Sequence, residues 1–254
     1  MIISENWLRE WVDFDLDFVT LADRLTAAGL EAGALALVPR VSEEVIAARI
    51  THLRPHPDAA SLSLCEVDSG SGSVIQVVCG AANARAGMVA PLAMPGAILP
   101  DGSVIRPTTI RNKVSTGMLC SGAELGIDDS VSGLLDLDPS LVPGTSLNAH
   151  LDLGDQLLEV DLTPNRGDCL SLLGIAREAA VVANGRLKIP SLARVRARSK
   201  LRREVELACP AECPRYMGRI IEGLDTTSRS PDWIRERLRR CGIRSIDVLV
   251  DISN

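Results

Sequence analysis

The apolar residues of the first 40 positions recur at the spacing of helices. In the stretch ENWLREWV, Ser4 can cap a helix that places Trp7 and Leu8 on one face. A second helix is predicted over residues 19–28, and Gly29, a residue type common just beyond helix C-termini, ends it. The chain is therefore expected to begin with two short amphipathic helices.

Between residues 41 and 150 the apolar residues gather instead in short runs rich in Val, Ile and Leu. Gly, Pro, Asp and Ser interrupt the runs about every ten residues. The runs read VIAARI, SLSLCEV, SVIQVVCG, MVAPLA and AILPDGSVI. Strands at this spacing predict a small β-barrel that is closed or nearly closed.

Helical spacing returns over residues 169–183. The stretch is apolar nearly all round, which is typical of a helix that docks into a core, and Asp168 suits its N-cap. If this helix packs on the N-terminal helices, the barrel is an insertion within a helical domain.

From Arg186 onward the pattern is less regular. Residues 186–203 hold eight basic residues and no acidic one, which is typical of a solvated linker or of a surface that meets phosphates. Beyond them we expect a strand over residues 218–224, a helix over 231–241 capped by Ser230, and a strand over 245–254. That last strand would lack a following partner, so the chain is expected to be cut inside a domain.

Composition places the chain among globular proteins. Apolar residues make up 46% of its 254 residues, which is enough for a core and is a prior for two domains. No apolar run approaches the roughly 18–20 residues of a membrane helix, and the N-terminus lacks the pattern of a signal peptide. A cytoplasmic protein is expected.

The seven cysteines do not form a metal pattern. Cys209 and Cys213 are four residues apart, Cys241 lies far downstream, and no histidine is nearby. Because the paired C-x-x-C spacing of structural zinc sites is absent, no metal site is predicted. The others lie in apolar runs, where a free cysteine behaves as a small buried hydrophobe.

The net charge of −6 is unevenly spread. Residues 186–254 carry 16 basic and 9 acidic side chains, and the preceding part of the chain has an acidic excess. The barrel segment 40–150 has 7 basic and 11 acidic residues. The asymmetry predicts two parts with different partners.

His56 and Asp58 are closely spaced ionisable groups, and their turn is a candidate for a catalytic or metal-binding site. Proline lies between them, Asp58 suits a turn capped by its own side chain, and no third ligand stands at metal spacing. A structural turn is the favoured interpretation, a binding loop the next, and catalysis the weakest. An independent hydrolase lacks a nucleophile–base pair.

Basic residues around a second turn are candidates for RNA binding. Arg111 and Lys113 precede the turn Ser-Thr-Gly and a buried run, which fits a barrel hairpin or a phosphate contact at the rim of a barrel face. Arg54, just before the His56 turn, is the third candidate. No catalytic residue is assigned.

Eight motifs occur in order along nearly the whole chain. They read ENWLREWV, AAGLE, HPDAASLSLCEVD, VVCGAANAR, STGMLCSGAELGI, TPNRGDCLSLLGIAREAA, CPRYMGR and RERLRRCGIRSIDVLVDISN. With these motifs the chain resembles the N-terminal part of the bacterial phenylalanyl-tRNA synthetase beta subunits.

The resemblance implies an α+β fold with an OB-fold β-barrel inserted in a small helical or mixed domain, followed by the start of an α/β editing domain. Residues 1–39 plus 151–190 would form the helical or mixed domain, and residues 40–150 an OB-fold of the tRNA-binding type. Residues 191–203 would be a basic linker. Residues 204–254 would begin the domain that hydrolyses mischarged tyrosyl-tRNA.

The resemblance also implies partners and a site. Members work as α2β2 heterotetramers in the cytoplasm, with no membrane, and join phenylalanine to tRNA(Phe) using ATP and magnesium. The aminoacylation site lies on the alpha subunit, so this chain would bind no cofactor itself. Arg244, in CGIRSID, matches an arginine associated with the editing pocket.

One stretch departs from tRNA-binding OB modules. Their basic residues after the HP motif are replaced here by Ser61, Ser63 and Glu66. Phosphate contacts dominate nucleic-acid affinity, so this departure counts against strong RNA binding by the barrel. The alternative function is a stand-alone OB-fold module that binds tRNA or acts as a scaffold without enzyme activity.

Overall fold

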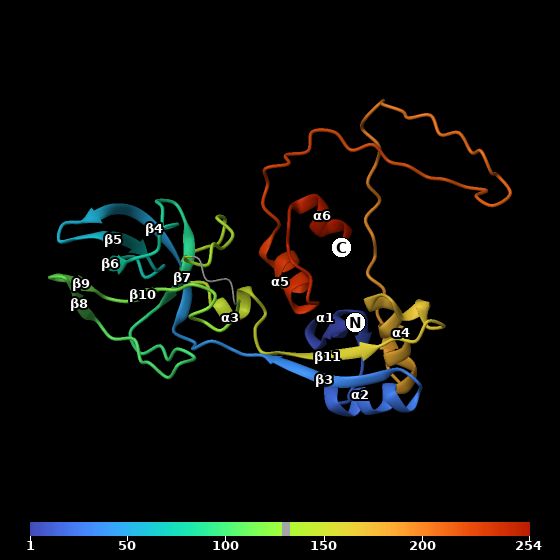
Figure 1. The fold of residues 1–254 in the computed structure, drawn as a ribbon, viewed down its shortest axis with the longest axis horizontal. Helices are drawn as coiled ribbons and strands as arrows, with labels where there is room; N and C mark the ends of the chain where they lie inside the picture. Colours follow the sequence, from blue (N-terminus) through green and yellow to red (C-terminus); the bar gives the residue numbers. More distant parts are fainter. Residues whose placement is uncertain (129–132) are drawn as a thin grey trace.

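The computed structural model describes residues 1–128 and 133–254. An N-terminal antiparallel sheet has the strand order β1-β11-β3, formed by β1 (Ile2–Ser4), β11 (Asp155–Asp161) and β3 (Glu31–Val38). Its central strand comes from the middle of the chain, far from its two neighbours in sequence. Figure 1 shows this sheet with helices α1, α2 and α4 gathered beside it.

The three helices share one core with that sheet. They are α1 (Glu5–Trp11), α2 (Phe18–Ala27) and α4 (Leu172–Val182), and their buried side chains include Leu8, Leu21 and Ile175. A two-residue ladder between β2 (Val12–Asp13) and β12 (Arg186–Leu187) ties the end of this unit to its start. Residues 3–30 and 158–187 thus pack as one body.

The predicted ends of the first helices are confirmed. Ser4 Oγ accepts a hydrogen bond from Trp7 N at 3.1 Å and satisfies one of the free amides of α1. Asp17 does the same for Thr20 N at the start of α2. Gly29 has φ of 92°, the left-handed conformation that favours glycine after a helix.

The predicted strand AILPDGSVI (97–105) is not found, because that run forms only an isolated bridge between Ile98 and Val104. The other four predicted runs of the middle segment lie in a second antiparallel sheet. Its order is β10-β7-β4-β5-β6, formed by β4 (Val45–His56), β5 (Ala59–Asp68), β6 (Val74–Cys79), β7 (Val89–Ala93) and β10 (Met118–Leu119). A hairpin of β8 (Thr108–Ile110) and β9 (Lys113–Ser115) stands beside it, and the short helix α3 (Leu147–His150) follows.

The sheet is not a fully closed barrel. Within the described residues, no ladder joins its edge strands β6 and β10. Individual hydrogen bonds connect β6 to the segment before β10 instead, from Thr116 N to Gln76 O at 2.9 Å, from Val78 N to Ser115 Oγ at 3.0 Å and from Gln76 Nε2 to Val114 O at 2.7 Å. One buried cluster containing Cys65 and Val67 and another containing Val45 and Leu125 fill the space around the strands.

The C-terminal part departs most from the sequence-based prediction. Residues 188–231 contain no helix or strand, so the strand predicted over 218–224 is wrong, and no neighbouring strand lies there to pair with it. The strand predicted over 245–254 is also wrong. Asp247 accepts hydrogen bonds from Leu249 N and Val250 N and starts helix α6 (Val248–Ser253) instead.

Two predicted caps are corrected as well. Helix α5 (Asp232–Arg240) has Pro231 at its N-cap, while the hydroxyl of Ser230 turns away and donates to Asp251 Oδ2. Helix α4 is capped by Ser171, whose Oγ accepts from Gly174 N at 3.1 Å. Asp168 lies instead in a short 3-10 turn (Gly167–Cys169). The predicted end of α5 at Gly242, with φ of 73°, is confirmed.

Candidate functional site

The His56 turn is structural. His56 is buried, and its Nδ1 accepts a hydrogen bond from Asp58 N at 3.1 Å. Nδ1 therefore carries no proton, and Nε2–H faces the carbonyl of Ile110 at 3.4 Å. The imidazole closes the β4–β5 turn and connects it to the β8–β9 hairpin.

This connection brings the three predicted RNA-binding residues to one end of the second sheet. Arg111 and Lys113 flank Asn112 at the tip of the β8–β9 hairpin, and Arg54 lies on β4 just before the His56 turn. Arg111 and Asn112 have φ of 47° and 64°, which makes a tight two-residue connection. We call Arg54, Arg111 and Lys113 the tip cations.

The tip cations are available for a ligand. Arg54 and Arg111 are exposed and Lys113 is partly exposed, and none of the three side chains forms a hydrogen bond or ion pair with a residue that the structure describes. By contrast, His52 on the same strand lies 3.4 Å from Glu66. The tip therefore carries positive charge on a sheet whose residues are acidic in balance.

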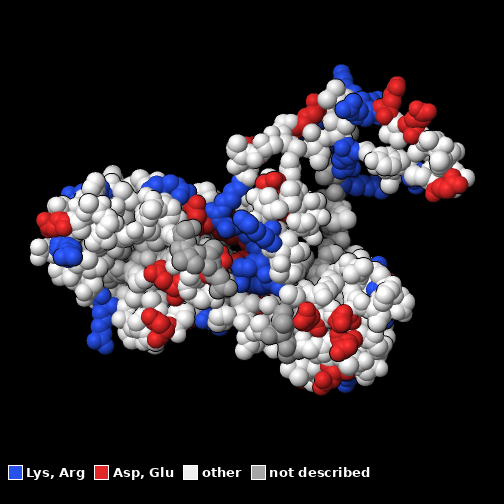
Figure 2. All heavy atoms as spheres, in the orientation of Figure 1, with Lys and Arg blue, Asp and Glu red and all other residues white. Residues whose placement is uncertain are grey.

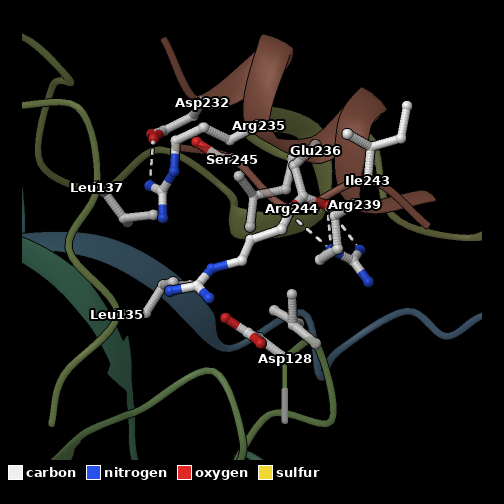
Figure 3. A pocket seen from close by; sticks show the side chains of 12 residues that line it. Asp128, Leu135, Leu137, Asp232, Arg235, Glu236, Arg239, Ile243, Arg244 and Ser245 are labelled. Atoms are coloured by element: carbon white, nitrogen blue, oxygen red, sulfur yellow. Dashed lines mark hydrogen bonds and ion pairs between the residues drawn. The ribbon is translucent and has the colours of Figure 1, made fainter. Parts of the chain in front are cut away.

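Arg244 lines a cavity of about 420 Å³ between α5 and the loop that follows β10. Figure 3 shows its side chain extending across the cavity toward Leu135, with Asp128 on the opposite wall. The remaining lining residues combine apolar side chains with charged groups from α5: Ile127, Leu137, Leu151, Asp232, Arg235, Glu236, Arg239, Ile243 and Ser245.

The other cations of the cavity are neutralised by neighbours on their own helix. Arg235 Nη1 lies 3.5 Å from Asp232 Oδ1, and Arg239 Nη2 lies 2.7 Å from Glu236 Oε2. Arg244 has no ion pair with any residue in the described parts of the chain. Among the described cations that line the cavity, Arg244 is therefore the one that can pair with a carboxylate or phosphate without competing with an existing ion pair.

Buried charges hold α5 against both sheets, and sequence reasoning missed them. The Asp232 carboxylate accepts from His150 Nε2 at 2.9 Å, Asp138 N at 2.8 Å and Arg229 Nη2 at 3.0 Å, which fixes the start of α5 to the second sheet's loops. At the other end of the helix, Arg240 Nη1 donates to Asp155 Oδ2 at 2.9 Å. The wall of the Arg244 cavity is fixed in this way.

A cluster with the spacing of metal ligands is already filled by a cation. Asp168, Cys169 and Glu178 offer three ligand atoms within 4.8 Å of one another. The guanidinium of Arg166 lies among them, with its Nη2 at 3.1 Å from Asp168, 3.0 Å from Cys169 Sγ and 2.9 Å from Glu178. The hydrogen bond from Arg166 also lowers the pKa of Asp168. Arg166 thus connects the 3-10 turn, through Asp168 and Cys169, to Glu178 on helix α4, and the cluster is not an open metal site.

Two family models match parts of the chain. The model described as "Putative tRNA binding domain" matches residues 45–146, which span the second sheet and the tip cations. The model described as "B3/4 domain" matches residues 212–254, which include α5, Arg244 and α6. No helix in the described ranges has the length and apolar character needed to cross a membrane.

Curated relatives match the whole chain. Phenylalanine–tRNA ligase beta subunits of Nitrosococcus oceani, Methylococcus capsulatus and Bordetella pertussis are 48%, 46% and 44% identical over 254 residues. Each match covers 100% of this chain and 32% of the relative.

A solved structure, the C-terminal domain of Plasmodium vivax p43, matches 43% of this chain and 61% of that chain. Its TM-score of 0.30 and identity of 14% are too low to bear on the fold. The curated relatives decide the family, because their alignments cover the whole chain at 44–48% identity and agree with both family models. The chain therefore belongs to the phenylalanine–tRNA ligase beta subunit family and spans about a third of the length of these relatives.

Proposed function

We propose that this chain is the non-catalytic N-terminal part of the beta subunit of a phenylalanine–tRNA ligase, the enzyme that attaches phenylalanine to its tRNA with ATP. The observation that carries the proposal is the identity of 44–48% to such subunits over the full chain. In this proposal the chain handles tRNA and contributes to assembly, and the aminoacylation site lies on the alpha subunit.

We further propose the division into domains. Residues 1–39 plus 151–190 form a helical or mixed domain, and the core shared by residues 3–30 and 158–187 supports this. Residues 40–150 form an incompletely closed OB-fold of the tRNA-binding type, supported by the family match over 45–146. Residues 191–203 are a basic linker, and residues 204–254 begin the editing domain, supported by the match over 212–254.

The proposed contacts with tRNA lie at two places. The tip cations would meet phosphates on the rim of the second sheet, because their side chains are exposed or partly exposed and have no partners in the described structure. Arg244 would meet the anionic acceptor end of the tRNA in the cavity beside α5, because its neighbours Arg235 and Arg239 are already neutralised.

The proposed partners follow from the whole enzyme. They are the alpha subunit, in an α2β2 heterotetramer, and tRNA(Phe), in the cytoplasm. ATP and magnesium would be used by the whole enzyme and not held by this chain. The described residues offer one cluster of metal-ligand spacing, and the Arg166 guanidinium already occupies it.

Fluorescence anisotropy with labelled tRNA(Phe) tests the tRNA contact at the tip. The chain is titrated at about 50 mM and about 200 mM salt, beside the variant R54A/R111A/K113A. Binding that weakens with salt, and whose salt slope falls by about 2 to 3 in the variant, supports the tip as a phosphate contact.

The matched control removes the same charge from exposed positions away from the tip, as R40A/R106A/R177A. An equal loss of affinity for tRNA(Phe) in both variants would show that the tip cations act only through the net charge of the chain. If the unmodified chain does not bind at the lower salt concentration, RNA binding by the second sheet is overturned. The loss of basic residues at Ser61, Ser63 and Glu66 would then explain the lack of binding.

A further inference from the structure

Five cations alternate with uncharged residues in the segment that follows the N-terminal unit. They are Arg194, Arg196, Arg198, Lys200 and Arg202, and we call them the basic strip. The residues between them are Val195, Ala197, Ser199 and Leu201. The segment has no helix or strand, and Figure 1 shows it as part of a long extended excursion (orange) from the body of the molecule.

An extended chain turns this alternation into a charged edge. Successive side chains point to opposite sides of an extended backbone, so the five cations share one side and the small or apolar residues the other. Cations two residues apart are then separated by about 6.7 Å along the chain. Stacked nucleic-acid strands carry one phosphate per about 3.4 Å of axis, so the strip matches every second phosphate.

The strip is unpaired, unlike the other arginine-rich segment of the chain. No side chain of the basic strip forms an ion pair or hydrogen bond with a residue in the described ranges, and all five are exposed. By contrast, Arg229 and every arginine of α5 (Arg235, Arg237, Arg239 and Arg240) have a carboxylate partner. A high density of arginines therefore does not by itself leave cations unpaired in this chain, and the lack of carboxylate partners sets the basic strip apart from α5.

Acidic residues begin only after the strip, at Glu204 and Glu206. Residues 186–203 contain no acidic residue, and the hollow beside the strip is lined by Leu192, Ala193, Val195 and three arginines, one of them Arg219. Figure 2 shows Lys and Arg gathered in the part of the excursion nearer the body of the molecule, with Asp and Glu both beside them and toward its far end. Five unpaired cations on one edge form a surface for a linear polyanion.

We propose that the basic strip is a second RNA-binding site, one that holds the sugar–phosphate backbone of a single-stranded segment. No aromatic residue occurs between residues 186 and 203, so the strip offers no aromatic ring on which bases could stack. Binding there is therefore set by charge and spacing, independent of base sequence and strongly dependent on salt. The identification of the polyanion as RNA rests on the proposed function of the chain.

Oligouridylate, a single-stranded RNA without secondary structure, is the probe for the strip. Fluorescence anisotropy of the 254-residue chain is compared with that of R196S/R198S/K200S over a range of salt concentrations from about 50 to about 300 mM. Loss of three phosphate contacts should lower the salt slope by about 2 and weaken binding by roughly tenfold or more at low salt. The control R40S/R106S/R177S, of equal charge, should weaken binding less than threefold.

Three results would overturn the proposal. One is equal weakening in the strip variant and the charge-matched control. Another is a clear difference in the affinity of the chain for oligouridylate, oligoadenylate and oligocytidylate, because binding to the backbone alone should not depend on the base. The third is a strip variant that loses binding to polyglutamate, added as a probe for acidic protein surfaces, but keeps its affinity for oligouridylate.

The variant R54A/R111A/K113A separates the strip from the proposed tRNA contact at the tip. If only the strip variant loses affinity for oligouridylate, the strip proposal is supported, whether or not the tip cations bind tRNA(Phe). If the tip variant alone loses both RNAs, the strip proposal fails and the proposed function remains. Because these substitutions lie outside the buried cores, unchanged far-ultraviolet circular dichroism is expected for all variants.

Discussion

The guanidinium of Arg240 lies 2.9 Å from the carboxylate of Asp155, and both side chains are almost completely buried. Asp155 also accepts from Ser4 Oγ and from the amide of Asn6, while Arg240 Nη2 donates to the carbonyl of Asp152 at 2.9 Å. One ion pair therefore joins the first strand, the central strand β11 and helix α5. A pair of this kind stabilises the fold only while both partners remain.

Replacing Arg240 by Ala should lower the free energy of unfolding by about 3–5 kcal/mol, because it leaves the Asp155 charge buried without its main partner. Urea denaturation measures the change. Arg239→Ala is the matched control on the next residue, whose salt bridge with Glu236 is partly exposed and should cost less than about 1 kcal/mol. Equal costs for the two variants would contradict a special role of the buried pair.

Gly174 should not tolerate a side chain. A Cβ at this position would lie 2.1 Å from Asp168 O and 2.8 Å from Cys169 Cα, so Gly174→Ala forces the 3-10 turn away from α4. Overpacking against backbone should cost about 3 kcal/mol or more in unfolding experiments. Gly167→Ala, in the same turn, meets nothing within 4 Å and should stay within about 1 kcal/mol of the unmodified chain.

His56 and His52 lie on the same strand but should respond differently to substitution. His56→Phe removes the acceptor of Asp58 N and the contact with Ile110 O, and should destabilise the chain by about 1–3 kcal/mol. His52→Phe changes an exposed side chain and should stay within about 0.5 kcal/mol. Thermal unfolding separates the two. A larger loss for His52 would contradict the structural role assigned to His56.

Burial raises the pKa of the Cys120 thiol from 9.0 to about 12, and the nearby charge of Glu124 adds to the shift. Above pH 9 the unfolded chain loses this proton while the folded chain keeps it. The free energy of unfolding should therefore fall by up to about 1.4 kcal/mol per pH unit between pH 9 and 12.

Cys120→Ala should make this decrease shallower, as measured by urea denaturation at pH 8, 9, 10 and 11. Cys209→Ala, at an exposed position, is the control and should keep the slope of the unmodified chain. An identical slope in all three proteins would show that Cys120 does not contribute to the decrease.

Local signals of the sequence predicted much of the fold. Ser4 and Gly29 mark helix ends because caps depend on one side chain or one backbone conformation, which the sequence displays directly. Runs of Val, Ile and Leu likewise predicted the strands of the second sheet. Where two caps competed, as for Ser171 over Asp168 before α4, the sequence alone did not decide between them.

Long-range partners explain the errors. The stretch SIDVLVDISN has the composition of a strand, but it has no strand beside it, and Asp247 caps a helix there. In the candidate site, Arg111 and Lys113 were predicted from their turn, and their role in RNA binding stays a prediction. The buried Arg240–Asp155 and Asp232–His150 pairs were missed, because residues about 80 positions apart reveal no contact in one sequence.

The order of strands in the first sheet has a consequence for synthesis of the chain. Ile2 pairs with Glu159 and Ser4 with Leu157, so the first strand has no strand to pair with until β11 has left the ribosome. Its other tie, through Asp155 to Arg240, waits until helix α5 has also emerged. The N-terminus emerges first but becomes fixed only after β11 has followed, so a translation product interrupted before β11 would present an unpaired first strand.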